Sequence, residues 1–216
     1  MTILTENPAK TLTLIVGAQN VSIDPSVLEE YSGKNTLNET RSPKCVVWPQ
    51  TVEQVKQIVD LANTKLISIV PVSSGDPRLR GDTIPLKENS IILNLSKMKK
   101  ILRVDRINKV AMVEAGVTYA DFVKELSKHN LRPLLPFLPR ASKSVVAGCL
   151  DRESITIPRY HWDSSDPLLC TEVVFGSGDI FRTGSAAGPG TLKEQWTSGQ
   201  AQKNPMGPSQ FDPFRI

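Results

Sequence analysis

The chain has 216 residues, of which 39% are hydrophobic and 22% are charged, as in a soluble globular protein with one large domain or two small lobes. Its net charge is +4 and its Lys and Arg residues are scattered, so the charge pattern does not support a nucleic-acid-binding role. This charge is compatible with an anionic substrate or cofactor.

The three cysteines, Cys45, Cys149 and Cys170, match no zinc-binding spacing and form no CxxC pair, so no metal site is expected. Dispersed cysteines in an odd number are typical of a reducing compartment. The N-terminus lacks the apolar segment of a signal peptide, and no apolar run of about 18 residues occurs that would span a membrane. We therefore expect a cytoplasmic protein without direct membrane insertion.

Residues 1–42 are expected to form an irregular arm laid over the main body, because few apolar positions recur there at a regular period. Within this arm, 12–17 fits either a strand or a short helix. Beyond it, Thr51 suits a helix N-cap and Gln54 completes a capping box. Apolar residues at helical spacing then predict a helix over about 51–64.

The strongest functional signal lies at 66–82. An apolar, β-branched strand at 66–72 breaks abruptly into Ser, Gly, Asp and Pro, which favour turns. Such a turn leaves several backbone N–H groups facing one way, and together with Ser and Arg side chains it suits phosphate oxygens. The stretch has neither the Gly-Lys-Ser/Thr of a P-loop nor the Gly-x-Gly-x-x-Gly of a dinucleotide fingerprint. Taken alone, an ordinary surface loop is the simpler interpretation.

The position of this loop favours the phosphate interpretation. A short strand at 45–48, the helix and the strand at 66–72 make a β-α-β unit, which implies parallel strands with a right-handed crossover. Ligands gather at the carboxyl ends of such strands, where residues 73–81 lie.

The middle of the chain alternates strands and helices. Strands are predicted at 90–95, 101–104 and 110–114, and Thr118 suits the N-cap of another helix. The run 144–150 packs small residues together, and two interpretations stay open for it. Either a flat ring or a ribose-phosphate lies against this backbone, or the run begins a helix that packs tightly against a sheet.

A hairpin is predicted across 176–178, between apolar runs at 168–175 and 179–182. From residue 184 the composition shifts toward Gln, Pro, Gly and Ser, so 185–216 is expected to be an irregular excursion. The chain stops within an apolar element, and we expect either a fragment of a longer protein or one piece of a split enzyme.

Five segments, at 43–62, 69–76, 91–98, 113–118 and 166–178, follow the order and spacing of a known family. They resemble the FAD-binding domain of the vanillyl-alcohol oxidase and p-cresol methylhydroxylase type. This FAD-linked oxidase family includes D-lactate dehydrogenases and the FAD subunit of glycolate oxidase. The resemblance covers roughly 12–184 and implies a chain truncated before the family's cap domain, which completes the substrate site.

The resemblance implies an α+β fold with a two-lobed FAD-binding domain. The first lobe, 43–105, would be a small parallel β-α-β lobe. The second, 106–184, would be a larger and mainly antiparallel sheet lobe with flanking helices. FAD would bind in extended form and non-covalently, because the loop at 71–82 holds no His for a covalent link.

The resemblance also implies which residues hold the cofactor. The pyrophosphate would lie on the loop, with further contacts from a second segment and two peripheral polar residues. These residues are Pro71, Val72, Ser73, Ser74, Gly75, Asp76, Leu79, Arg80, Gly81, Ala147, Gly148, Cys149, Leu150, Glu153 and Asp166. The loop departs from the family's usual Gly-Gly-Gly-Thr, and Asp76 would repel a pyrophosphate unless Arg78 or Arg80 neutralised its charge.

The implied activity is dehydrogenation of a 2-hydroxy acid such as lactate or glycolate, with hydride transfer to flavin N5 and removal of the hydroxyl proton by a base. The base stays unassigned. His161, between two aromatic residues, is a better candidate than His129, although a structural role is the simpler interpretation for both. Arg140, Arg152 and Arg159 fit a substrate carboxylate or, more simply, solvated or interdomain charges.

The alternative function is that of a non-catalytic flavin-domain fragment, or of an electron-transfer or interaction subunit in a larger complex. The expected partners are a small-molecule substrate and an electron-transfer subunit. The two hypotheses differ in whether the natural chain continues into a substrate-binding part.

Overall fold

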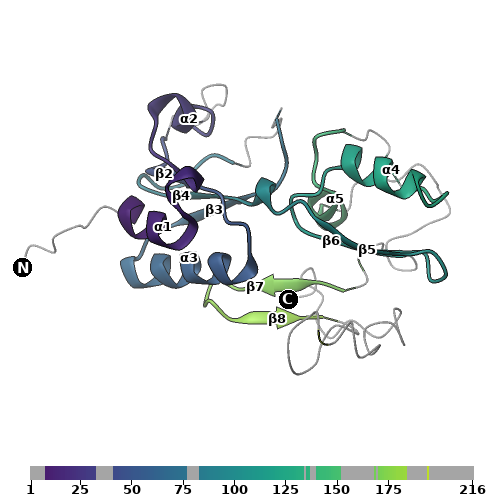
Figure 1. Cartoon of the computed structure of the whole chain (residues 1–216). Coiled ribbons are helices and arrows are strands. Elements are labelled where there is room, and N and C mark those ends of the chain that lie inside the picture. The colour runs from purple at the N-terminus through teal and green to yellow at the C-terminus, as the bar shows by residue number, and fades with distance from the viewer. Residues whose placement is uncertain are drawn as a thin grey trace, which may run out of the picture. The chain divides into compact units, whose positions relative to one another are not determined.

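A computed structural model of the chain (Figure 1) describes residues 8–32, 41–76, 83–133, 135–136, 140–151, 168, 170–183 and 194. The chain divides into two compact units, Met1–Thr156 and Ile157–Ile216. The described residues contain helices together with parallel and antiparallel strand pairs, which confirms the predicted α+β class. The domain boundaries expected after residues 42, 105 and 184 stay predictions.

The first unit contains a four-stranded sheet in the order β1-β2-β4-β3. β1 (Val21–Ser22) pairs antiparallel with β2 (Cys45–Val47), whereas β4 (Ile91–Asn94) pairs parallel with both β2 and β3 (Ile69–Val72). Helix α3 (Val52–Lys65) connects β2 to β3. The predicted β-α-β unit is therefore present, with β4 inserted between its two strands.

Local sequence signals set the two ends of α3. The Thr51 hydroxyl accepts a hydrogen bond from the Gln54 N–H at 3.2 Å, as an N-cap does. The Gln54 side chain accepts from the N–H of Gln50 at 2.8 Å, one residue before the partner that a standard capping box uses. Leu66 ends the helix in the left-handed conformation, with a φ of 52°.

Helices cover both faces of this sheet. α1 (Pro8–Val16) and α3 lie on one face and α2 (Pro25–Glu29) on the other (Figure 1). Every residue of β2 and β4 is buried, as expected for parallel strands that are covered on both sides. On the α2 side, Tyr31 packs with Val46 and Ile92 in a buried cluster.

The N-terminal arm is more regular than its sequence indicates. The described residues 8–32 hold α1, the 3₁₀ turn η1 (Ala18–Asn20), β1 and α2. The segment 12–17, left open between strand and helix, is helical as far as Val16. A long-range hydrogen bond ties this segment to the sheet: the Asn20 carbonyl accepts from the Trp48 N–H at 2.9 Å.

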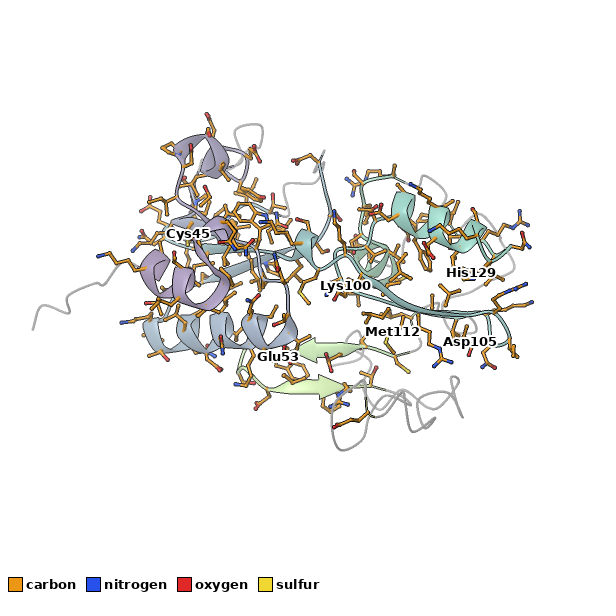
Figure 2. All side chains as sticks on the ribbon, in the orientation of Figure 1. Cys45, Glu53, Lys100, Asp105, Met112 and His129 are labelled. Carbon is orange, nitrogen blue, oxygen red and sulfur yellow. The ribbon has the colours of Figure 1, made fainter. Side chains whose placement is uncertain are left out.

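A hairpin and two helices complete the described part of the first unit. The elements are η2 (Leu95–Lys97), β5 (Ile101–Asp105), β6 (Val110–Val113), α4 (Tyr119–Ser127) and α5 (Val145–Leu150). Asp105, labelled in Figure 2, fixes the hairpin turn: its Oδ1 accepts from the N–H groups of Ile107 and Asn108, each at 3.0 Å. Hydrogen bonds from Asn108 hold the pKa of the Asp105 carboxyl below its ordinary value. Val117 and Val145 belong to a second buried cluster that these elements share.

The described part of the second unit is a hairpin of β7 (Glu172–Val174) and β8 (Ile180–Arg182), paired antiparallel. Gly178 has a φ of 91° in the connecting turn, so the hairpin predicted across 176–178 is confirmed. β7 begins at Glu172, later than the predicted 168, whereas β8 ends at Arg182 as predicted. Across the pair, the Arg182 Nε lies 3.3 Å from the Glu172 Oε2.

Among the helices that the structure describes, none is long and apolar enough to cross a lipid bilayer. The cytoplasmic location expected from the sequence stays a prediction.

The buried thiol of Cys45, labelled in Figure 2, should make the stability of the fold depend on pH. Burial in β2 raises the pKa of its thiol from an ordinary 9.0 to about 11. Above pH 9.0 the unfolded chain loses this proton while the folded chain keeps it, so rising pH favours unfolding. We expect the free energy of unfolding to fall by roughly 1.4 kcal/mol per pH unit within this window.

The measurement is urea unfolding across the same pH range, for the chain and for Cys45→Ala. Other groups titrate there too, so the informative quantity is the difference in slope between the two proteins. Parallel slopes would mean that the thiol is ionised as readily in the folded chain as in the unfolded one.

Candidate functional site

The loop after β3 is described as far as Asp76. Val72 is buried where the strand ends, Pro71 is exposed, and Ser73 and Ser74 are half-buried. Several residues of the predicted site lie outside the described residues. These are Leu79, Arg80, Gly81, Glu153, Asp166 and the candidate base His161.

The backbone N–H groups of this loop differ in their partners. No described residue accepts a hydrogen bond from the Ser73 or Ser74 N–H. The Gly75 N–H, in contrast, donates to the Ser142 carbonyl at 2.8 Å. The predicted group of unpaired donors is therefore smaller than the sequence indicates, and Gly75 is bonded within the protein instead.

Ser144 joins this loop to the second predicted segment. Its N–H donates to the Ser74 Oγ at 3.0 Å, although the two residues are 70 positions apart. Its own hydroxyl donates to the Ala115 carbonyl at 2.6 Å and accepts from the Ala147 N–H at 3.2 Å, which caps α5. Ser144 is fully buried. The Ser74 hydroxyl accepts from Ser144 and keeps its own proton to donate.

The structure thus brings the loop at 73–76 into contact with Ser144, the first residue of the small-residue run at 144–150. The intervening segment 140–144 is anchored at the start of α4, where the Lys143 carbonyl accepts from the Tyr119 N–H and the Ala141 carbonyl from the Ala120 N–H, each at 3.0 Å.

Gly75 leaves room for a ligand. Its φ lies outside the left-handed region, and among the described residues an added Cβ would meet only Ser142, at an ordinary 3.5 Å. Neither backbone strain nor packing against the part of the chain that the structure describes requires a glycine here. A glycine at such a position lets a ligand approach the backbone closely.

Gly148 has a different reason to be glycine. An added Cβ would overlap the Tyr119 hydroxyl and lie 2.9 Å from its Cε2. The sequence left open whether a flat cofactor ring or tight packing explains the small residues here. The Tyr119 ring occupies the space next to Gly148, so tight packing accounts for this glycine. Of the four residues predicted in this segment, Ala147 is half-buried and Leu150 is 37% exposed, whereas Cys149 packs against the second buried cluster.

The charged groups near the site provide no metal-binding cluster. Within the described ranges, no three His, Cys, Asp or Glu side chains lie close enough together to hold a metal ion. His129, labelled in Figure 2 just beyond α4, has its Nε2 3.6 Å from the Glu125 Oε1. It follows the C-terminal end of that helix and is half-buried.

A mixed α+β domain whose parallel strand ends in a Ser/Gly loop, bonded to the start of a small-residue helix, has the form of a nucleotide-binding domain. Comparison with protein families identifies which kind of nucleotide-binding domain this is. The FAD binding domain family matches residues 43–184, and the chain belongs to this family. The predicted resemblance is confirmed, and FAD is the cofactor of the domain.

Individual relatives agree with this assignment. The 4-cresol dehydrogenase [hydroxylating] flavoprotein subunit of Pseudomonas putida is 31% identical over 181 residues, covering 82% of this chain and 34% of that protein. The glycolate oxidase subunit GlcD of Bacillus subtilis is 27% identical over 183 residues, covering 84% of this chain and 38% of that protein. The chain therefore spans little more than a third of the length of these relatives.

A solved structure supports the fold. The crystal structure of p-cresol methylhydroxylase with substrate bound superposes with a TM-score of 0.71 at 29% sequence identity. The match covers 87% of this chain and 36% of that one.

The contact between Gly148 and Tyr119 predicts the behaviour of a double-mutant cycle. Gly148→Ala should lower the free energy of unfolding by about 1–3 kcal/mol, because the new methyl group overlaps the Tyr119 ring. Tyr119→Phe removes the hydroxyl, so Gly148→Ala should cost less in that background. Urea unfolding of the four proteins measures the coupling.

Gly176→Ala is the matched control, because no heavy atom of the described residues lies within 4 Å of its added Cβ. An equal cost of Gly148→Ala in both backgrounds would show that the Tyr119 hydroxyl is not what excludes a side chain at this position.

Proposed function

We propose that this chain is the FAD-binding portion of an FAD-linked oxidoreductase, with the pyrophosphate held at 73–76 and next to the start of α5. One observation carries the residue assignment. Gly75 has no side chain although neither its φ nor any of its described neighbours excludes one, and the loop around it is held in place by bonds to Ser142 and Ser144.

Each residue of the loop has a distinct proposed role. The Ser73 and Ser74 N–H groups donate to phosphate oxygens, and the Ser74 hydroxyl adds a third donor. Gly75 lets the phosphate approach the backbone closely. Its own N–H continues to donate to the Ser142 carbonyl, which holds the loop in its conformation. The site residues that lie outside the described ranges remain part of the proposal through the family resemblance.

FAD is proposed to bind non-covalently. The loop at 71–82 contains no His, and the described His129 lies at the end of α4 near Glu125. When bound, FAD supplies the redox chemistry by accepting the hydride that leaves the substrate carbon. The chain's own residues bind and orient it, and the base that takes the substrate proton stays unassigned.

The first candidate substrate is a 2-hydroxy acid such as lactate or glycolate. The glycolate oxidase subunit among the relatives supports this class. A 4-substituted phenol is the second candidate, supported by the 31% identity to the 4-cresol dehydrogenase subunit. Both relatives are named as subunits, which supports an electron-transfer partner for this protein as well. A non-catalytic flavin domain remains the alternative.

The substrate class can be tested on the natural full-length product that carries this chain, loaded with FAD and kept free of oxygen. We expect its flavin absorbance to be bleached by one class only, because a site that pairs a carboxylate lacks the apolar walls that hold a phenol ring. Bleaching by glycolate or D-lactate supports the first candidate, and bleaching by 4-cresol supports the second. Bleaching by neither contradicts both and favours the non-catalytic alternative.

Gly75→Ala tests the proposed phosphate loop. Without FAD the variant should be as stable as the unmutated chain to within about 1 kcal/mol, because the new methyl group fits beside Ser142. With FAD, the methyl group occupies the space of the phosphate, so the dissociation constant should rise by about tenfold or more. Fluorescence titration with FAD and thermal unfolding measure the two effects separately.

Gly176→Ala should leave both quantities unchanged. Failure of the folded, unmutated chain to bind FAD would refute the proposed function. If Gly75→Ala binds FAD as tightly as the unmutated chain, the pyrophosphate does not bind at Gly75, and the proposed phosphate loop is wrong.

A further inference from the structure

Lys143 is a buried lysine that precedes Ser144 in the candidate site. Its side chain is 3% exposed, that of Asp151 is 45% exposed, and the Lys143 Nζ lies 2.5 Å from the Asp151 Oδ2. Lys143 directly precedes Ser144, the N-cap of α5, and Asp151 is the C-cap of the same helix. The ion pair therefore spans α5 from one end to the other.

Helix stability does not explain these two charges. A helix favours anions at its N-terminus and cations at its C-terminus, and this pair has the opposite arrangement. Burying an ammonium group is also costly, and a buried ion pair is often no more stable than apolar residues of the same size. A role in fixing geometry is the better explanation.

The backbone hydrogen bonds around Lys143 show which segment the ion pair holds in place. The Lys143 carbonyl accepts from the Tyr119 N–H at 3.0 Å, and its N–H donates to the Arg140 carbonyl at 3.0 Å. The next N–H along the chain, that of Ser144, bonds the Ser74 Oγ. A side chain held at Lys143 therefore holds the segment 142–144 that contacts the loop.

We infer that the Lys143–Asp151 pair is a clamp that sets the register of residues 142–144 against Ser74 and Gly75, and so shapes the FAD site before FAD binds. This inference rests on the proposed function for its consequence in binding. Lys143 and Asp151 are positioning residues: they act through the loop and are not assigned a contact with the cofactor.

The chain offers a matched control on α3. Lys56 and Asp60 form an ion pair with an Nζ–Oδ2 distance of 2.7 Å, and their side chains are 43% and 46% exposed. The chemistry is the same, but this pair is solvated and bonds no part of the loop at 73–76.

The experiment uses Lys143→Met, Asp151→Asn and the double variant, with Lys56→Met/Asp60→Asn as the control. Each single variant should lower the Tm, because it leaves one charge without its partner in the pair. The double variant should recover most of the Tm, since Met fills the space of the lysine stem. Its FAD dissociation constant should nevertheless stay about tenfold higher, roughly the loss of one well-placed hydrogen bond. The control should change neither quantity.

A second measurement needs no FAD. In the unmutated chain, the N–H groups of Ser144 and Gly75 should exchange slowly with deuterium, and both should exchange faster in the double variant. If the unmutated chain does not bind FAD, the proposed function fails. The exchange rates of these two amides then test the clamp by themselves. Unchanged exchange at both amides, or FAD binding as tight as in the unmutated chain, would overturn it. If the double variant does not fold, Asp151→Asn at its half-exposed position provides the same readouts.

Discussion

The hydrogen bond from the Ser144 N–H to the Ser74 Oγ is the contact on which the candidate site depends. It joins the end of a parallel strand to the beginning of a helix that the chain reaches 70 residues later. Ser144 is buried, and its hydroxyl also bonds the Ala115 carbonyl, so three segments meet at one residue. Buried polar groups of this kind specify one arrangement, because any other leaves them unpaired.

The fold was predictable where local chemistry decides it. Thr51 and Thr118 both cap the helices expected of them, and each accepts from the N–H three residues on. The β-branched runs around Val46, Val70 and Ile92 became parallel strands in register. The N-terminal arm was not predictable in the same way, because β1 has only two residues and is ordered by pairing with β2. Such a strand is too short to leave a periodic pattern in the sequence.

The sequence singled out the two segments of the candidate site but did not indicate how they are connected. The Ser/Gly break after β3 and the small-residue run at 144–150 both carried a signal, yet no pattern in either indicated that Ser144 bonds Ser74. Gly75 and Gly148 look alike in sequence, and only their described neighbours show that a side chain fits at Gly75 and would overlap Tyr119 at Gly148. The Lys143–Asp151 pair was missed altogether, because a lysine in a polar, Pro-rich stretch is expected to be solvated.

Pro71 has a consequence for how this domain associates with itself. It lies in β3, the outermost strand of the described four-stranded sheet, and lacks the N–H that an incoming strand would need as a donor. An unprotected outer strand next to a functional loop would invite pairing with the same strand of another molecule. The proline interrupts that surface two residues before the loop begins, and so opposes strand-to-strand aggregation.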